Sequence, residues 1–356
     1  MSVANTTVSD IYPFTHYSPA QRVLFGTGLA RHNLRHELNQ FQSPRPFLVV
    51  SGSSRSHLPT VCDGIDHLRT YDEVMPHVPV ETARRARQAA QAHGANILVA
   101  LGGGSAIGLA KAIALQDHYP ILAIPTTYAG SEATNVWGIT DARHKQTGTD
   151  EAVRPQSIIY DADLTEGLAP AVRASSGVNA LAHGIDAMWA PQANPINRSW
   201  AIEGIRALAT GLPQVCGSED NVNGRELSLY GAYLAASAFS SAGSGLHHKI
   251  CHVLGGAYDL PHAHTHAIIL PHVLAFNAAA FPEAERRIAY ALGASCATGG
   301  LSALLKRLNT PASLTSIGFD PSSIAAAAEL IVPYVPTGNP RPVSRADIEA
   351  ILCAAC

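Results

Sequence analysis

Charged residues are scarce in this sequence. Asp, Glu, Lys and Arg make up 14% of its 356 residues, whereas an average soluble domain has roughly 25%. Only four residues are lysines, and no block of Lys or Arg occurs. These features argue against a nucleic-acid-binding protein, which would carry a basic stripe. The formal net charge of −3 still leaves room for an anionic small molecule held by a few placed cations.

A hydrophobic run long enough to span a membrane is also lacking. The longest uncharged stretch, residues 227–246, contains five serines and three glycines, so we interpret it as a packed helix and not as a bilayer span. The first 13 residues lack the basic and apolar segments of a signal peptide. The six cysteines are scattered, which is typical of reduced thiols. We therefore expect a cytoplasmic protein that binds neither membranes nor nucleic acids.

Histidine, by contrast, is abundant. The chain has 17 histidines, and seven of them lie between His247 and His272. Imidazole is the side chain best suited to proton transfer and metal binding near neutral pH. This local excess is the first indication of where the chemistry lies.

The pattern of apolar residues predicts two domains. Short aliphatic runs bounded by polar residues, Gly or Pro are typical of strands buried on both faces of a parallel sheet, and they occur at residues 47–50, 97–101 and 121–124. Helical patterns separate them, which indicates a doubly wound, mostly parallel α/β domain over residues 1–162. Residues 163–356 are rich in Ala, Leu, Gly and Ser at helical spacing. We expect an all-helical second domain there, with the ligand between the two domains.

A glycine cluster marks the predicted cofactor site. Gly102, Gly103, Gly104 and Ser105 follow a predicted strand and precede a helical segment. Glycines allow a close backbone approach, and free N–H groups at a helix start bind anions, so we predict a pyrophosphate site. The alternative is a plain tight turn. Thr126 and Thr127 follow the next strand and are predicted to reach the same dinucleotide, with helix capping as the alternative.

The end of the first strand bears on the choice of nucleotide. A carboxylate there would bind the ribose 2′-hydroxyl and repel a 2′-phosphate, but the sequence reads Ser51-Gly52-Ser53-Ser54-Arg55. We assign Ser51 to the cofactor site and predict NADH as cofactor, with NADPH also usable. Arg55 is either a phosphate contact or an exposed loop residue. Lys145 is assigned to the cofactor site, with a substrate carboxylate as its other candidate partner.

The histidines of the second half have a regular spacing. Asn179 and His183 are four residues apart, as are His248 and His252, so each pair shares one helix face. His262 follows after a break at two glycines. The outline is that of a metal site. Lys249, inside the cluster, indicates an anionic ligand, with a surface lysine as the alternative.

These motifs together resemble the iron-containing alcohol dehydrogenase superfamily, and within it the maleylacetate reductase branch. The resemblance rests on residues 102–105, 125–134, 179–183 and 246–256 and runs from Arg22 to Pro342. It implies a dehydroquinate synthase-like architecture, a homodimer and a small dicarboxylate substrate. The implied reaction is the NAD(P)H-dependent reduction of the carbon–carbon double bond of 2-maleylacetate to 3-oxoadipate in the catabolism of aromatic compounds.

The resemblance also implies a ligand set. Metal-dependent members hold a divalent ion with one aspartate and three histidines, and the matching positions here are Asn179, His183, His248 and His262. An amide carries no charge to offset a dication, and the resemblance implies that the reductase branch works without metal. We therefore expect no metal. His252 and His183 are the leading candidates for stabilising an enolate and protonating it, with His248, His262 and Lys249 in support.

Three alternatives remain open at this point. The first is a metal-dependent alcohol or polyol dehydrogenase of the same superfamily, in which a residue such as Asp186 replaces the missing ligand. The second is a lyase on the related dehydroquinate synthase fold. The third is a binding protein with a degenerate site, which the density of titratable groups disfavours.

Overall fold

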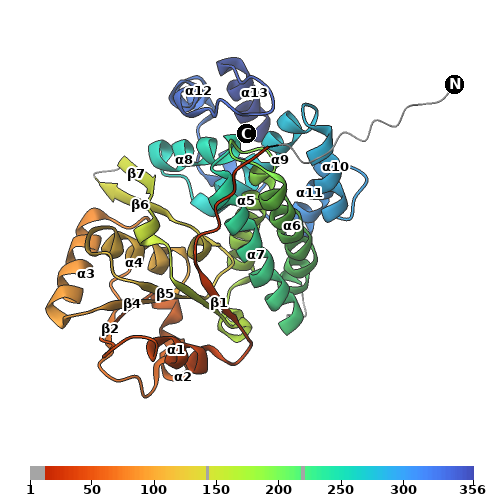
Figure 1. Ribbon diagram of the computed structural model, residues 1–356. Coiled ribbons are helices and arrows are strands. Elements are labelled where there is room, and N and C mark those ends of the chain that lie inside the picture. Colours follow the sequence, from red (N-terminus) through yellow and green to blue (C-terminus); the bar gives the residue numbers. More distant parts are fainter. Residues whose placement is uncertain (1–12, 142–143, 218–220) are drawn as a thin grey trace.

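The computed structural model describes residues 13–141, 144–217 and 221–356 (Figure 1). An α/β part is followed by a part built from helices. The α/β part contains a six-stranded sheet and a separate two-stranded hairpin. The fold class predicted from the sequence is confirmed.

The six-stranded sheet is entirely parallel, in the order β1-β8-β5-β4-β2-β3. Its strands are β1 (Arg22–Phe25), β2 (Pro46–Val50), β3 (Arg69–Tyr71), β4 (Ile97–Gly102), β5 (Ile121–Pro125) and β8 (Ser157–Tyr160). The helices that alternate with them are α1 (Ala30–Leu38), α2 (Leu58–Cys62), α3 (Val80–His93) and α4 (Gly104–Asp117). Parallel strands of this kind place their carboxyl ends at one edge of the sheet, where ligands bind.

Alternation along the strands explains why helices cover both faces of this sheet. Phe47 and Val49 belong to a core shared with α3 and α4, whereas Leu48 and Val50 belong to a core shared with α1 and α2. Successive side chains of a strand point to opposite faces, so a run of apolar residues is buried only when both faces are covered. The three strands predicted from the sequence are apolar runs of this kind, buried along their whole length.

The remaining strands escaped the sequence prediction for local reasons. β1 and β3 lie at the two edges of the sheet, and most of their residues are exposed. β8 has only three apolar or aromatic residues after its serine. The hairpin of β6 (Val136–Asp141) and β7 (His144–Thr149) is antiparallel and mostly polar, so it has no apolar run.

Helices make up the second part, and it begins where the sheet ends. β8 ends at Tyr160 and α5 begins at Pro170, and the predicted domain boundary at 162/163 falls between them. The helices are α5 (Pro170–Ala187), α6 (Pro195–Cys216), α7 (Val222–Ala242), α8 (Leu246–Tyr258), α9 (His262–Ala278), α10 (Pro282–Ala291), α11 (Ala297–Arg307), α12 (Ile324–Ile331) and α13 (Arg345–Ala355).

The uncharged stretch noted in the sequence is the core of α7, which packs closely on α6. A Cβ on Gly204 of α6 would come within 2.8 Å of the Ala235 amide nitrogen, and one on Gly231 within 2.9 Å of the Gly204 carbonyl oxygen. Small residues therefore let the two backbones approach, which explains the high Gly, Ala and Ser content. No helix among the described residues is both long and apolar enough to cross a membrane.

Lys111 of α4 fastens the segment that follows β5. The side chain is fully buried, and its Nζ donates to the carbonyl oxygens of Ser131, Thr134 and Val136 and to Oγ1 of Thr134 at 2.7–3.0 Å. A buried ammonium is tolerated only when its hydrogens are bonded in this way. Lys111 is therefore structural, although it is one of only four lysines.

Replacing Lys111 by Met is expected to lower the free energy of unfolding. The change removes the donor and leaves buried carbonyl oxygens unsatisfied, which costs about 1–3 kcal/mol. Urea unfolding followed by circular dichroism measures the effect. Lys306→Met is the matched control, because Lys306 lies exposed on α11; equal losses in the two variants would contradict this role.

Candidate functional site

Three strand ends build the predicted cofactor site. Ser51 follows β2, Gly102 ends β4, and Thr126 follows β5, and hydrogen bonds connect them. The Ser51 hydroxyl donates to Ser54 Oγ at 2.9 Å, and Ser54 Oγ lies 3.0 Å from Thr126 Oγ1. The Thr126 amide donates to the Gly102 carbonyl oxygen at 3.2 Å. The structure thus brings these predicted residues together at the carboxyl edge of the sheet.

The glycines shape a cradle at the start of α4. Gly102 has a φ of +151°, which L side chains rarely adopt, and a Cβ there would meet Ser51 Oγ at 2.7 Å. A Cβ on Gly103 would meet Thr127 Cγ2 at 2.8 Å. Gly104 begins α4 and is exposed, and a Cβ added there would have no neighbouring atom within 4 Å. Open space in front of a helix N-terminus, with Ser105 in its first turn, suits a pyrophosphate.

Arg55 and Lys145 are the two other residues that the sequence places near the cofactor. The guanidinium of Arg55 forms an ion pair with Asp72, which follows β3. An acidic residue therefore stands beside this edge of the sheet after all, contributed by a strand that the sequence did not reveal. Lys145 lies in β7, and its side chain is outside the described part of the structure.

The loop after β5 connects the cofactor edge to the helical part. The Ala129 carbonyl oxygen accepts from Asn179 Nδ2 at 3.2 Å, and the Tyr128 amide donates to Ser176 Oγ at 3.4 Å. At Gly130, with φ +78°, a Cβ would lie 3.5 Å from His183 Nδ1. A dinucleotide at the cradle would therefore extend its reactive end toward α5.

The spaced histidines come together in the helical part. The rings of His183 on α5 and His248 on α8 are stacked, with centroids 5.0 Å apart. His252 lies one turn along α8, its centroid 6.1 Å from that of His248, and His262 at the start of α9 lies 6.2 Å from His252. Lys249 is half-buried in α8 beside them. The four predicted histidines thus form one cluster, and Asn179 lies one turn before His183 on α5.

Asp186 is the residue of this site whose role the sequence did not reveal. Its carboxylate is fully buried on α5, and Oδ2 accepts from His248 Nδ1 at 2.8 Å and from the Gly245 amide at 2.9 Å. Oδ2 is thus engaged by α8, which makes Asp186 a support for His248. The available signal was its position three residues after His183, on the same helix.

Burial sets the charge state of the two inner histidines. It lowers the pKa of His183 to about 4, and it lowers the pKa of His248 well below its ordinary value. Both imidazoles are therefore neutral near pH 7. A neutral imidazole has a lone pair on one ring nitrogen, so these two rings suit a metal ligand better than the acid predicted from the sequence. His252 and His262 are only half-buried.

Buried atoms without partners show that the cluster fits a divalent ion. Asn179 Oδ1 and His248 Nε2 are buried and have no hydrogen-bond partner. Because His248 Nδ1 donates to Asp186, its Nε2 carries the lone pair. Neutral imidazoles and an amide oxygen are acceptable donors for Fe²⁺ or Zn²⁺. Asn179, His183, His248 and His262 are thus the residues that would hold the metal.

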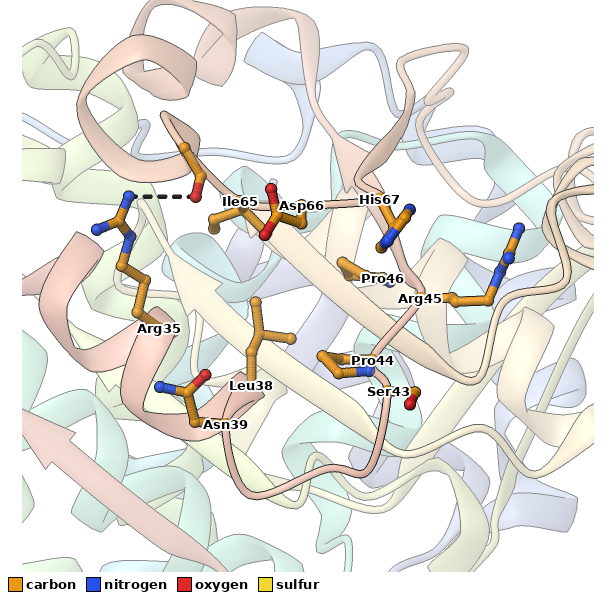
Figure 2. A pocket seen from close by; sticks show the side chains of 11 residues that line it. Arg35, Leu38, Asn39, Ser43, Pro44, Arg45, Pro46, Ile65, Asp66 and His67 are labelled. Atoms are coloured by element: carbon orange, nitrogen blue, oxygen red, sulfur yellow. Dashed lines mark hydrogen bonds between the residues drawn. The ribbon is translucent and has the colours of Figure 1, made fainter.

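A surface cavity of about 500 Å³ lies elsewhere and does not belong to this site. Figure 2 shows it between α1 and the start of β2, with Arg35, Leu38, Arg45 and His67 around it. The Arg35 guanidinium is bonded to carbonyl oxygens of the neighbouring loop. Pro46 is the first residue of β2, so the cavity is at the amino-terminal edge of the sheet, away from the predicted cofactor.

Fold and site together define a two-domain dehydrogenase-type protein, and comparison with known proteins gives its family. The family model "Iron-containing alcohol dehydrogenase" matches residues 20–162, and "Fe-containing alcohol dehydrogenase family, C-terminal" matches residues 173–356. The chain belongs to the iron-containing alcohol dehydrogenase family.

Individual relatives cover nearly the whole chain. A maleylacetate reductase from Burkholderia cepacia is 43% identical over 333 residues, 93% of this chain and 94% of its own length. The crystal structure of an iron-containing alcohol dehydrogenase from Corynebacterium glutamicum has a TM-score of 0.94 at 49% identity, covering 97% of each chain. That of a maleylacetate reductase from Agrobacterium tumefaciens has a TM-score of 0.91 at 36% identity, covering 97% of this chain and 98% of the other.

Family membership corrects the expectation about metal. The expectation that no metal is needed, because Asn179 stands in place of an aspartate, is wrong. The family is iron-containing, and the unpartnered donor atoms at Asn179 and His248 fit such an ion. The missing charge of an aspartate does not prevent binding, since three imidazoles alone are a common ligand set for a divalent metal.

Replacing Gly104 by Ala is expected to weaken NADH binding without harming the fold. The new methyl group would enter open space in front of α4, where the pyrophosphate is predicted, and we expect a Kd increase of about tenfold, equivalent to about 1.4 kcal/mol. Fluorescence titration with NADH measures it. Gly167→Ala, also in open space but outside the site, is the control. Unchanged affinity in Gly104→Ala would place the pyrophosphate elsewhere.

Asp186→Asn tests the support of the metal position. Asn still accepts a hydrogen bond from Gly245 but no longer holds His248 through a carboxylate, and loss of such an outer partner weakens metal binding about 10- to 100-fold. Competition titration with Fe²⁺ or Co²⁺ gives the affinity, and thermal unfolding reports on the fold. Asp63→Asn, at an exposed ion pair with Arg31, is the control. An affinity equal to that of the unmodified protein would remove Asp186 from this role.

Proposed function

We propose that this protein is a maleylacetate reductase, an oxidoreductase that uses NADH, with NADPH also usable, to reduce 2-maleylacetate to 3-oxoadipate. One observation carries the proposal. The cluster contains imidazoles, a lysine and the neutral amide of Asn179, while the carboxylate of Asp186 is buried and bonded to His248. Such a pocket suits a substrate with two carboxylates. The maleylacetate reductases similar to the chain over nearly its full length support the same reading.

The chemistry places two demands on the pocket. Maleylacetate has a carbon–carbon double bond conjugated to a ketone, so hydride addition at the carbon β to the ketone sends negative charge to the ketone oxygen. The nicotinamide supplies the hydride, and a divalent ion supplies Lewis-acid stabilisation of negative charge on oxygen. The chain must then deliver a proton to the α-carbon and hold two carboxylates.

His252 is the residue that we assign to the proton. It is half-buried and lies at the edge of the cluster, so it keeps contact with water from which the proton is replaced. His183 and His248 are buried deeper and neutral, which suits ligands. Lys249 lies one turn before His252 on α8 and is the candidate partner of a substrate carboxylate.

The surroundings of the reaction are also proposals. We infer a cytoplasmic homodimer with no nucleic-acid or membrane partner. The edge strand β1 supports the dimer, because Val23 and Phe25 are about two-fifths exposed there (38% and 43%) and an open parallel edge is a surface that a second chain covers.

Oxidation of NADH and NADPH by maleylacetate, measured with metal-loaded protein, tests the proposal. We expect turnover with maleylacetate and little with simple alcohols or diols plus NAD⁺. The opposite preference would favour the metal-dependent alcohol or polyol dehydrogenase. Absence of net NADH oxidation with every substrate would instead point to a lyase or a binding protein.

His252→Ala is expected to lower kcat strongly. Loss of a general acid costs about 10²- to 10⁴-fold, whereas NADH binding should stay nearly unchanged because the cradle lies on the sheet. Steady-state kinetics and NADH titration measure the two effects. His36→Ala, exposed on α1, is the control; a His252→Ala variant with normal turnover would exclude His252 as the acid.

A further inference from the structure

A second group of histidines lies behind the proposed reaction site. His247 and Cys251 are four residues apart on α8, and His266 faces them from α9. His247 Nε2 lies 2.8 Å from His266 Nδ1 and 3.7 Å from Cys251 Sγ, and the three donor atoms all lie within 4.8 Å of one another. Among the described residues, this is the group of His, Cys and acidic side chains whose donor atoms lie close enough together to share one ion. The donor atoms of the set implied by the family lie farther apart.

The proposed reaction gives these residues no task. All three are at most 1% exposed, so none contacts a substrate in the outer pocket. One hydrogen bond joins the two rings, and the remaining nitrogens, His247 Nδ1 and His266 Nε2, are buried with no hydrogen-bond partner. An apolar core would fill this space at lower cost, so packing alone does not account for two imidazoles and a thiol here.

The donor types and the burial select the kind of ion. Thiolate and imidazole are soft and borderline ligands, which favour soft cations. A monovalent cation bound to one thiolate has no net charge, whereas a divalent one would leave a positive charge in a place without water, which is costly. Three donors also suit a three-coordinate ion. Binding releases the Cys251 thiol proton to solvent. The proton between the two rings moves to the other nitrogen of the ring that carries it, so both rings stay neutral, and no electron is transferred.

Neighbouring rings join this group to the outer histidines. The ring centroids of His252 and His262 are 6.2 Å apart, those of His262 and His266 are 4.4 Å apart, and those of His266 and His247 are 4.8 Å apart. The first two of these residues are half-buried, and the last two are buried. The group therefore adjoins the proposed reaction site and lies deeper in the helical part.

We propose that His247, Cys251 and His266 form a buried site for a soft monovalent cation such as Cu⁺, separate from the family's metal position. The imidazole nitrogens are 2.8 Å apart, so an ion about 2.0 Å from each, the usual metal–imidazole distance, needs the rings to separate only slightly. Because His247 directly precedes His248 in the chain, a cation bound at His247 would be a direct neighbour of the family's metal position.

Anaerobic titration of the full-length protein with Cu⁺, in competition with a coloured Cu⁺ chelator, tests the site. The family position is first filled with Zn²⁺. We expect one tight Cu⁺ per chain, and X-ray absorption of the Cu⁺ form should show one sulfur and two imidazole nitrogens. A spectrum without sulfur, or no tight binding, would overturn the proposal.

Variants separate this site from other thiols and from the outer pocket. Cys251→Ser should weaken Cu⁺ binding by more than about 100-fold, since a directly bound donor matters more than an outer partner, and His266→Asn should also weaken it. Cys296→Ser, at an exposed thiol, should leave it unchanged. His183→Ala should leave it unchanged too; a loss there equal to that in Cys251→Ser would mean that Cu⁺ binds in the outer pocket.

Discussion

The arrangement of the site depends on the hydrogen bonds that the buried carboxylate of Asp186 accepts from α8. The carboxylate joins α5 to the start of α8 by accepting from the Gly245 amide and from His248 Nδ1. A Cβ on Gly245 would come within 2.3 Å of Asp186 Oδ1, so α8 can begin this close only with glycine there. A buried charge is stable only when it is bonded in this way. Through this one contact, His248 is stacked on His183 with its free nitrogen available.

The loop after β5 makes a single site from two domains. Lys111 holds it from the sheet side through four acceptors, and Asn179 holds it from the helical side through the Ala129 carbonyl oxygen. Oδ1 of the same Asn179 amide is buried and has no hydrogen-bond partner. A cofactor on the sheet and a metal among the helices are therefore aligned by a segment that neither domain fixes alone.

The histidines of residues 247–272 differ in how deeply they are buried, and burial determines their charge state. Those that are buried, such as His248, are neutral and have an electron pair to donate, while His252 and His262 are only half-buried. The charge lost when asparagine stands in for aspartate leaves the pocket more positive around any bound ion. We infer that an asparagine at this position favours an anionic substrate while the three histidines stay in place.

The sequence by itself determined the fold class, the glycine cradle and the helical register of Asn179, His183, His248 and His252, because apolar periodicity and residue spacing are local properties of the chain. It did not reveal β1, β3 or the β6–β7 hairpin, whose exposure leaves no apolar run. Only the tertiary structure decided that Asp72 pairs with Arg55, that Asp186 holds His248, and that His247, Cys251 and His266 form a separate group. Those contacts join residues far apart in sequence, or depend on which side of α8 is buried, and burial is decided only when helices pack.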